Sequence, residues 1–188
     1  SIEEFIEVVE SGGIKGFMVL YSNDDGWTYF LKLDEDDLNK QFLYFSYIMN
    51  APQASAQTGG RPSNGKVLEF RNFKKEKIGL YQINTSYINK NKNNNISKSS
   101  LTNITEAFVE VFKPSAKTGN SVLINVNSIL LSEKMDSISY VPSEYREYIS
   151  VNYGNQDESK TFVRNVFNNK TNTAFEVTFA YENRMPNI

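Results

Sequence analysis

The sequence predicts an α+β fold, mostly an antiparallel sheet or an open pseudobarrel of about seven strands with three or four helices. Short runs of strand-forming residues are separated by turns rich in Gly, Asn, Asp and Pro. Helical spacing of apolar residues is confined to a few segments. The length of 188 residues suits one domain, expected over residues 1–188, either alone or as the N-terminal recognition domain of a longer protein.

The first 33 residues predict a short helix followed by a β-hairpin. Apolar positions 2, 5, 6 and 9 have helical spacing over residues 2–10, and Gly12-Gly13 ends that pattern. Residues 14–21 and 27–33 are rich in strand formers. The segment Asn23-Asp24-Asp25-Gly26 lies between them and has the composition of a tight turn, which predicts a hairpin.

Residues 34–50 predict a helix. The segment opens with four acidic residues, which are favoured in the first turn of a helix because the N-terminal end of the helix dipole is positive. The apolar positions 38, 42, 45 and 49 that follow are three or four residues apart. The acidic run also has the chemistry to hold a divalent cation, but the first-turn explanation accounts for it without a metal.

The middle of the chain predicts two strands and two polar loops. Residues 66–73 and 78–85 have strand composition and flank the basic turn Lys74-Lys75-Glu76-Lys77. Residues 51–66 form a long polar loop, of a length that is often functional. Residues 89–100 are dominated by Asn, Lys and Ser and predict a low-complexity surface loop.

The last third predicts further strands and one short helix. Residues 101–112 fit either a helix or a strand, and residues 121–131 predict a strand that bends near its end. Residues 142–149 predict a helix of one or two turns with proline near its start. Two strand-like runs, 161–167 and 173–181, predict a second hairpin.

The absence of cysteine and histidine excludes several classes of chemistry. Disulfides, thiolate nucleophiles, the common histidine base and most zinc sites are ruled out. Hydrolysis would therefore need carboxylates with a metal ion, or a lysine base. The Glu-x-Lys pattern of metal-dependent nucleases occurs once, at Glu158-Ser159-Lys160. A metal-dependent nuclease is the third of three functional hypotheses. We predict no cofactor.

The chain has no apolar stretch near the roughly 20 residues that a membrane span needs. Its first residues, Ser1-Ile2-Glu3-Glu4, also lack the pattern of a signal peptide. We therefore expect a cytoplasmic protein without membrane contact.

The net charge of −2 is the sum of strongly unequal segments. Residues 1–40 carry a net charge of −7, residues 41–60 carry no charge, residues 61–98 carry +7 and residues 99–188 carry −2. A polyanion responds to such local fields rather than to the net charge. The alternative is that the acidic and basic segments neutralise each other across the fold.

A short motif occurs twice, at 55–60 (Ser-Ala-Gln-Thr-Gly-Gly) and at 115–120 (Ser-Ala-Lys-Thr-Gly-Asn). Small hydroxyl residues beside glycine leave main-chain N–H groups accessible to an anionic oxygen. The motif therefore predicts two ligand-facing loops that converge at one end of the molecule. The alternative is two solvent-exposed loops that need glycine only for their backbone geometry.

The two motif loops and the basic turn provide the candidate DNA-binding residues. Hydroxyl and amide side chains hydrogen-bond phosphates or base edges, and lysines contribute the sequence-independent attraction to phosphate. Arg61 is the best candidate for reading a base, because guanidinium pairs with two guanine acceptors. For the lysines, an ordinary solvated surface is the alternative. The candidates are Ser55, Gln57, Thr58, Arg61, Asn64, Lys66, Lys74, Lys75, Lys77, Lys117, Thr118 and Asn120.

The segment 113–120 (Lys-Pro-Ser-Ala-Lys-Thr-Gly-Asn), placed between two strand-like runs, resembles a DNA-contacting arm of the B-three-like pseudobarrel domains of restriction enzymes. Residues 55–60 are similar in their Thr-Gly-Gly. Neither copy has the His-Gln that usually follows in that family. The resemblance implies an open barrel with two arms that grip the major groove of DNA.

The leading hypothesis is a non-catalytic DNA-recognition domain, part of a bacterial or phage restriction or defence protein whose motor or nuclease lies elsewhere. Its expected partners are duplex DNA and the other domains or subunits of a larger assembly. The second hypothesis is a protein-interaction or structural module that binds another protein through a surface rich in Tyr and Phe.

Overall fold

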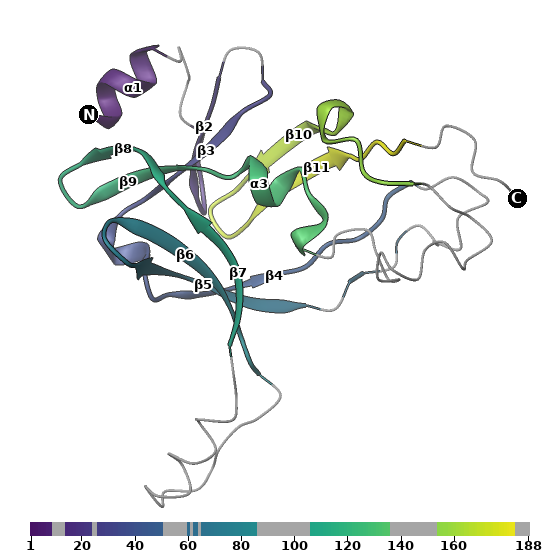
Figure 1. Ribbon diagram of the computed structural model, residues 1–188, viewed down its shortest axis with the longest axis horizontal. Helices are drawn as coiled ribbons and strands as arrows, with labels where there is room; N and C mark the ends of the chain where they lie inside the picture. Colours follow the sequence, from purple (N-terminus) through teal and green to yellow (C-terminus); the bar gives the residue numbers. More distant parts are fainter. Residues whose placement is uncertain are drawn as a thin grey trace, which may run out of the picture.

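The computed structural model describes residues 1–8, 14–23, 26–50, 60, 62–63, 65–85, 106–135 and 154–182. Eleven strands of this part of the chain form three sheets, and neighbouring strands pair antiparallel throughout. Figure 1 shows two larger sheets that meet at an angle, with a two-stranded hairpin beside them.

The five-stranded sheet has the order β1-β2-β3-β9-β8. It combines the N-terminal strands with a hairpin from the middle of the chain, because β3 pairs with β9. β2 and β3 match the predicted N-terminal hairpin, whereas the single strand predicted over 14–21 is divided into β1 and β2, which pair with each other. The strands are β1 (Ile14–Lys15), β2 (Val19–Ser22), β3 (Tyr29–Leu33), β8 (Pro114–Thr118) and β9 (Ser121–Asn125).

Helix α1 (Ile2–Val8) lies beside β8, as Figure 1 shows at the upper left. Ile2 is buried in a small cluster with Phe30 and Leu123, and the Phe5 and Phe30 rings meet edge to face with centroids 5.2 Å apart. These contacts join the helix to the five-stranded sheet, and the helix predicted at the start of the chain is confirmed over Ile2–Val8.

The four-stranded sheet has the order β4-β5-β6-β7, so β4 and β7 are its edge strands. Only Lys113 separates β7 from β8 of the other sheet, and the two strands form one bent ribbon (Figure 1). A strand that changes sheets in this way turns the inner faces of both sheets toward a shared core. The strands are β4 (Gln41–Tyr44), β5 (Lys66–Phe73), β6 (Lys77–Ile83) and β7 (Ala107–Phe112).

That shared core is filled by aliphatic side chains from both larger sheets. Leu20 and Ile124 come from the five-stranded sheet and Leu68, Ile78 and Leu80 from the four-stranded sheet, and each is essentially inaccessible to solvent. Burial of one such side chain contributes about 1.5–3 kcal/mol. Because these side chains come from both sheets, their burial requires the two sheets to face each other at this angle.

The third sheet is the hairpin of β10 (Phe162–Asn168) and β11 (Thr173–Thr178), which matches the predicted C-terminal hairpin. Its turn is anchored to the first strands. The Asn168 side-chain amide donates hydrogen bonds to the carbonyls of Ile14 (3.0 Å) and Met18 (2.6 Å). These bonds position the hairpin although some 150 residues separate its sequence from β1.

The predicted α+β class with about seven strands and three or four helices is wrong. The described residues contain two short α-helices, α1 and α3 (Asn127–Leu130), against eleven strands in three sheets, and the sheets do not close into a barrel. Three short 3-10 turns complete the described elements: η1 (Glu35–Asp37), η2 (Glu133–Met135) and η4 (Glu158–Lys160). No helix in these ranges is long and apolar enough to cross a membrane.

The helix predicted over residues 34–50 is the clearest error. Asp34 and Asp37 form a capping box around the single turn η1, and the chain then reverses at Asn39, which has a φ of 59°. Strand β4 follows. The acids therefore cap one turn rather than a long helix, and the apolar spacing of three or four residues coincides with a strand.

Other elements resolve what the sequence left open. Residues 107–112 of the ambiguous segment form β7, and the segment 121–131 divides into β9 and α3. The helix predicted at 142–149 and the loop predicted at 89–100 lie outside the described residues.

Replacing Gly16 with alanine should destabilise the fold. A Cβ at this position would lie 2.3 Å from Asn168 Oδ1 and 2.9 Å from the main-chain carbon of Asn168, so the β10–β11 turn would have to move. We expect a loss of about 1–3 kcal/mol in the free energy of unfolding, measured by urea denaturation. Gly65→Ala is the control, since its Cβ would meet nothing closer than 3.4 Å. Equal effects of the two changes would contradict the anchoring role of Asn168.

Candidate functional site

A cleft of about 270 Å³ lies where the turn between β5 and β6 meets the start of β8. We call it the basic cleft. Four of its lining residues are lysines and one is an acid, which gives the lining a net charge of +3 in a protein whose net charge is −2. The lining residues are Lys75, Glu76, Lys77, Lys113, Pro114 and Lys117.

The register of the sheet explains why these lysines meet. Ile78 of β6 pairs with Phe112 of β7, so continuing this antiparallel register places Lys77 opposite Lys113. Like charges in directly opposed positions destabilise a sheet. Lys117 reaches the same place because the chain bends at Lys113 and continues as β8. An anion in the cleft would relieve this repulsion.

The turn between β5 and β6 has an unusual backbone. Lys74 and Glu76 have positive φ angles of 24° and 70°, and the Lys77 N–H donates to the Lys74 carbonyl at 3.1 Å. Non-glycine residues adopt such angles at a cost of about 1 kcal/mol or more. The Lys74 ammonium lies over the ring of Phe73, 5.5 Å from its centroid, and Lys74 is not among the lining residues.

Glu76 is the one acid in the lining, and it forms an ion pair with Lys117 at 3.3 Å. Both side chains are exposed, at 77% for Glu76 and 44% for Lys117. Exposed pairs of this kind contribute about 0–1 kcal/mol. An incoming phosphate can therefore replace the Glu76 carboxylate as the partner of Lys117 at little cost.

The second copy of the repeated motif is a strand and a tight turn, not a loop. Pro114–Thr118 is β8, and Gly119 adopts a φ of 57° in the turn before β9. Thr118 Oγ1 accepts a hydrogen bond from the Ile2 N–H at 2.8 Å and donates one to Glu3 Oε2 at 2.8 Å. The hydroxyl predicted to face a ligand therefore binds the N-terminal helix.

The turn of the second motif contacts the acidic segment instead of an anion. The Asn120 amide donates to Glu35 Oε2 at 2.5 Å, and the neighbouring Ser121 hydroxyl donates to Asp34. Of the three candidate residues in this copy, Lys117 lines the cleft, whereas Thr118 and Asn120 bind carboxylates of the chain itself. Neutral donors thus bind carboxylates of residues 1–40 here without cancelling their charge.

Gly60, the described residue of the first copy, lies beyond the other end of β5. The Gly60 N–H donates to the Ile48 carbonyl at 2.6 Å, and Pro62 bridges to Tyr47, which extends the β4–β5 pairing beyond Tyr44 and Lys66. Eight residues of strand separate this end from the basic turn, a distance of about 25 Å. Gly60 is the one described residue of the first copy, so the expected convergence of Thr58 and Thr118 stays a prediction. The candidates Ser55, Gln57, Thr58, Arg61 and Asn64 lie outside the described residues.

Arg71, another base of the 61–98 segment, is bound to two acids. Its Nε donates to Glu69 at 2.5 Å, its guanidinium forms a two-bond contact with Glu106, and it lies 4.9 Å from the centroid of the Tyr81 ring. The hydrogen bonds to Glu106 and Glu69 raise the pKa of Arg71 above its usual value. The guanidinium is therefore already paired with two carboxylates on the outer face of the sheet, although the side chain is 30% exposed.

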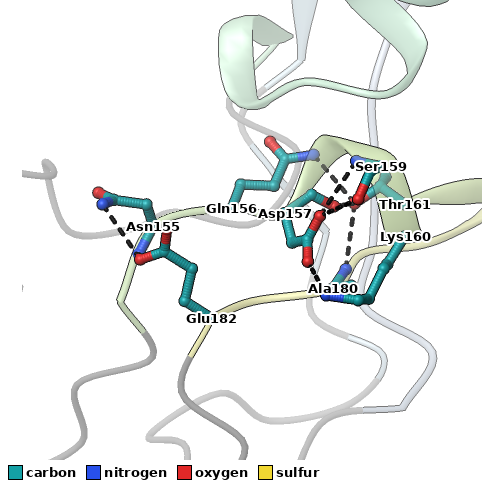
Figure 2. Close-up of polar contacts among 8 residues, drawn as sticks. All are labelled: Asn155, Gln156, Asp157, Ser159, Lys160, Thr161, Ala180 and Glu182. Atoms are coloured by element: carbon teal, nitrogen blue, oxygen red, sulfur yellow. Dashed lines mark hydrogen bonds and ion pairs between the residues drawn. The ribbon is translucent and has the colours of Figure 1, made fainter.

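The Glu158-Ser159-Lys160 tripeptide also has a structural role (Figure 2). The Asp157 carboxylate accepts hydrogen bonds from the Ser159 main chain (3.1 Å) and hydroxyl (2.6 Å), and it pairs with Lys160. Thr161, fully buried, accepts from the Ala180 N–H at 3.1 Å, which closes the base of the β10–β11 hairpin. Across the described ranges, no group of three metal-binding side chains occurs. The tripeptide therefore gives the nuclease hypothesis no support.

Lys113 is the residue that sequence reasoning missed. The signal was present, because Lys-Pro stands between two strand-forming runs and proline disfavours a regular continuation of pairing. Its proximity to Lys77 depends on pairing between β6 and β7, which no local pattern reveals.

Comparisons of the chain with protein-family models, curated proteins and solved structures found no match.

The contact between Asp34 and Ser121 should make stability depend on pH. The hydrogen bond from Ser121, followed by that from Lys32, lowers the pKa of Asp34 in the folded protein. This contribution is present above the unfolded pKa of about 4 and is lost as pH falls through the folded value. Between about pH 5 and pH 3, the unfolding free energy should fall less steeply in Asp34→Asn than in the wild type, measured by urea denaturation. Asp36→Asn, in the same turn, is the control, and parallel curves for Asp34→Asn and wild type would contradict the assignment.

Proposed function

We propose that the protein is a non-catalytic DNA-binding domain that contacts the phosphate backbone through the basic cleft. The observation that carries this proposal is the meeting of four lysines around one cleft, from the β5–β6 turn, β6, the β7–β8 bend and β8. Lysine is a compact point charge suited to phosphate oxygens. The single acid, Glu76, is exposed and is readily displaced from Lys117.

The cleft supports attraction to a polyanion rather than recognition of sequence. Lysine contacts to phosphate fix the position of a duplex but carry no base information. Base reading is assigned in this proposal to the polar loop that contains Arg61. A role in a restriction or defence protein of the cytoplasm rests on the resemblance of residues 113–120 to the pseudobarrel arm, and is part of the same proposal.

Binding to a duplex of random sequence should weaken steeply as salt rises. Each lysine that contacts phosphate releases about one counterion, so Lys77→Ala and Lys113→Ala should each lower the slope of log affinity against log salt by about one. Fluorescence anisotropy with a labelled duplex measures this slope. Lys170→Ala is the matched control, since Lys170 is exposed in the β10–β11 turn.

Two results would overturn the cleft as the binding site. The first is the absence of binding at low salt. The second is binding whose salt slope is the same for wild type, Lys77→Ala and Lys113→Ala.

Arg61 should act through geometry rather than charge alone. Guanidinium can form two parallel hydrogen bonds with guanine O6 and N7, which lysine cannot reproduce. Arg61→Lys should therefore keep nonspecific affinity and lose about 1–3 kcal/mol of discrimination at one base pair. Selection from a duplex library with both proteins measures this preference. An unchanged preference would restrict Arg61 to backbone contact or exclude it from the site.

A further inference from the structure

A stripe of apolar side chains is exposed along β4 and its continuation. Leu43 is 66% exposed, Phe45 57%, Tyr47 56% and Met49 56%. They are alternate residues of β4 and the segment that follows it, in which Tyr47 bridges to Pro62 and Met49 lies in a bend, and the residues between them are partly buried. We call these four residues the β4 stripe. Single exposed apolar residues are ordinary, but a contiguous group of four large ones marks an interaction surface.

The main chain of the β4 stripe is also directed toward the open edge of the sheet. Ser46 accepts a hydrogen bond from the Ser63 N–H at 2.6 Å, and Ile48 accepts one from the Gly60 N–H at 2.6 Å. Residues 46 and 48 thus direct their polar groups toward β5 and its extension. In an antiparallel ladder the direction alternates, so the N–H and C=O groups of residues 43, 45 and 47 point away from β5.

This edge lacks the charges and prolines that usually protect an edge strand from pairing. Natural sheets place lysine, other charges, proline or bulges on exposed edge strands. Residues 41–50 contain no charged residue and no proline, although residues 1–40 and 61–98 are highly charged. Residues 41–50 therefore present no charge to an identical strand, and the one irregularity is a register shift of one residue between the pairs Tyr44–Lys66 and Tyr47–Pro62.

We propose that the edge of β4 pairs antiparallel with the same edge of a second copy of this chain, forming a two-fold symmetric dimer with one continuous eight-stranded sheet. A two-fold axis near Phe45 or Ser46 brings outward-pointing residues of both copies into hydrogen-bonded pairs. The stripes then lie side by side on one face, where aromatic cross-strand pairs are stabilising. The interface is isologous, because each copy contributes the same residues.

The area available agrees with a dimer of modest affinity. Large side chains have surfaces on the order of 200 Å², so four that are more than half exposed carry about 400 Å² of exposed surface per copy. Stripes that lie side by side bury only their facing flanks, so together with the main-chain edge the interface stays below the lower limit of about 1,200 Å² for stable specific interfaces. We therefore expect association at micromolar concentrations rather than an obligate dimer.

Sedimentation equilibrium of the wild-type chain over a range of micromolar concentrations tests this proposal. We expect a monomer–dimer equilibrium whose dissociation constant rises at least about tenfold in Phe45→Lys, because two like charges would face each other across the axis. Phe167→Lys is the matched control, since Phe167 is 55% exposed and lies on β10. Circular dichroism verifies that both variants fold.

Cross-linking provides a second readout that does not depend on the stability of the variants. The chain has no cysteine, so Phe45→Cys and Phe167→Cys each carry a single thiol. A short bis-maleimide should join two copies of Phe45→Cys and leave Phe167→Cys monomeric. A wild-type chain that stays monomeric throughout, a dimer that Phe45→Lys leaves intact, or equal cross-linking of the two cysteine variants would overturn the proposal.

Discussion

The fold depends on one bent strand that belongs to two sheets. β7 forms the edge of the four-stranded sheet, and after Lys113 the chain continues as β8 at the edge of the five-stranded sheet. This connection sets the angle at which the sheets meet, and the buried aliphatic core fills that angle. The same bend brings Lys113 and Lys117 beside the β5–β6 turn. The core and the basic cleft are therefore consequences of a single change of direction in the chain.

Several acidic residues bind partners that lie outside the basic cleft. The acidic residues around η1 and α1 bind hydroxyl and amide groups near the β8–β9 turn, such as Thr118 and Asn120. Arg71 lies between two carboxylates on the outer face of the four-stranded sheet. These contacts leave the lysines of the cleft with one exposed acid among them, which explains how a protein with a net charge of −2 keeps a positive site.

Sequence reasoning succeeded where structure is determined by neighbouring residues. The hairpins of β5–β6 and β10–β11 follow from strand-forming runs separated by short polar turns, and α1 follows from apolar spacing. The segment 34–50 failed because apolar spacing of three or four residues is also compatible with a strand that has two apolar faces, as Phe42 toward the core and Leu43 toward solvent show. The cleft was found only in part, because Lys113 and Lys77 meet through strand pairing that local patterns do not encode.

The two proposed surfaces are compatible because they lie toward opposite ends of the four-stranded sheet. The β4 stripe extends past the start of β5, whereas the basic cleft lies at the turn after Phe73. A two-fold dimer through β4 would place one cleft on each side of the axis, separated by on the order of 60 Å if the strands ran straight. Linked sites of this kind raise the affinity for a ligand only when it spans both. Dimerisation would therefore favour long duplexes over short ones without any change in the contacts at either cleft.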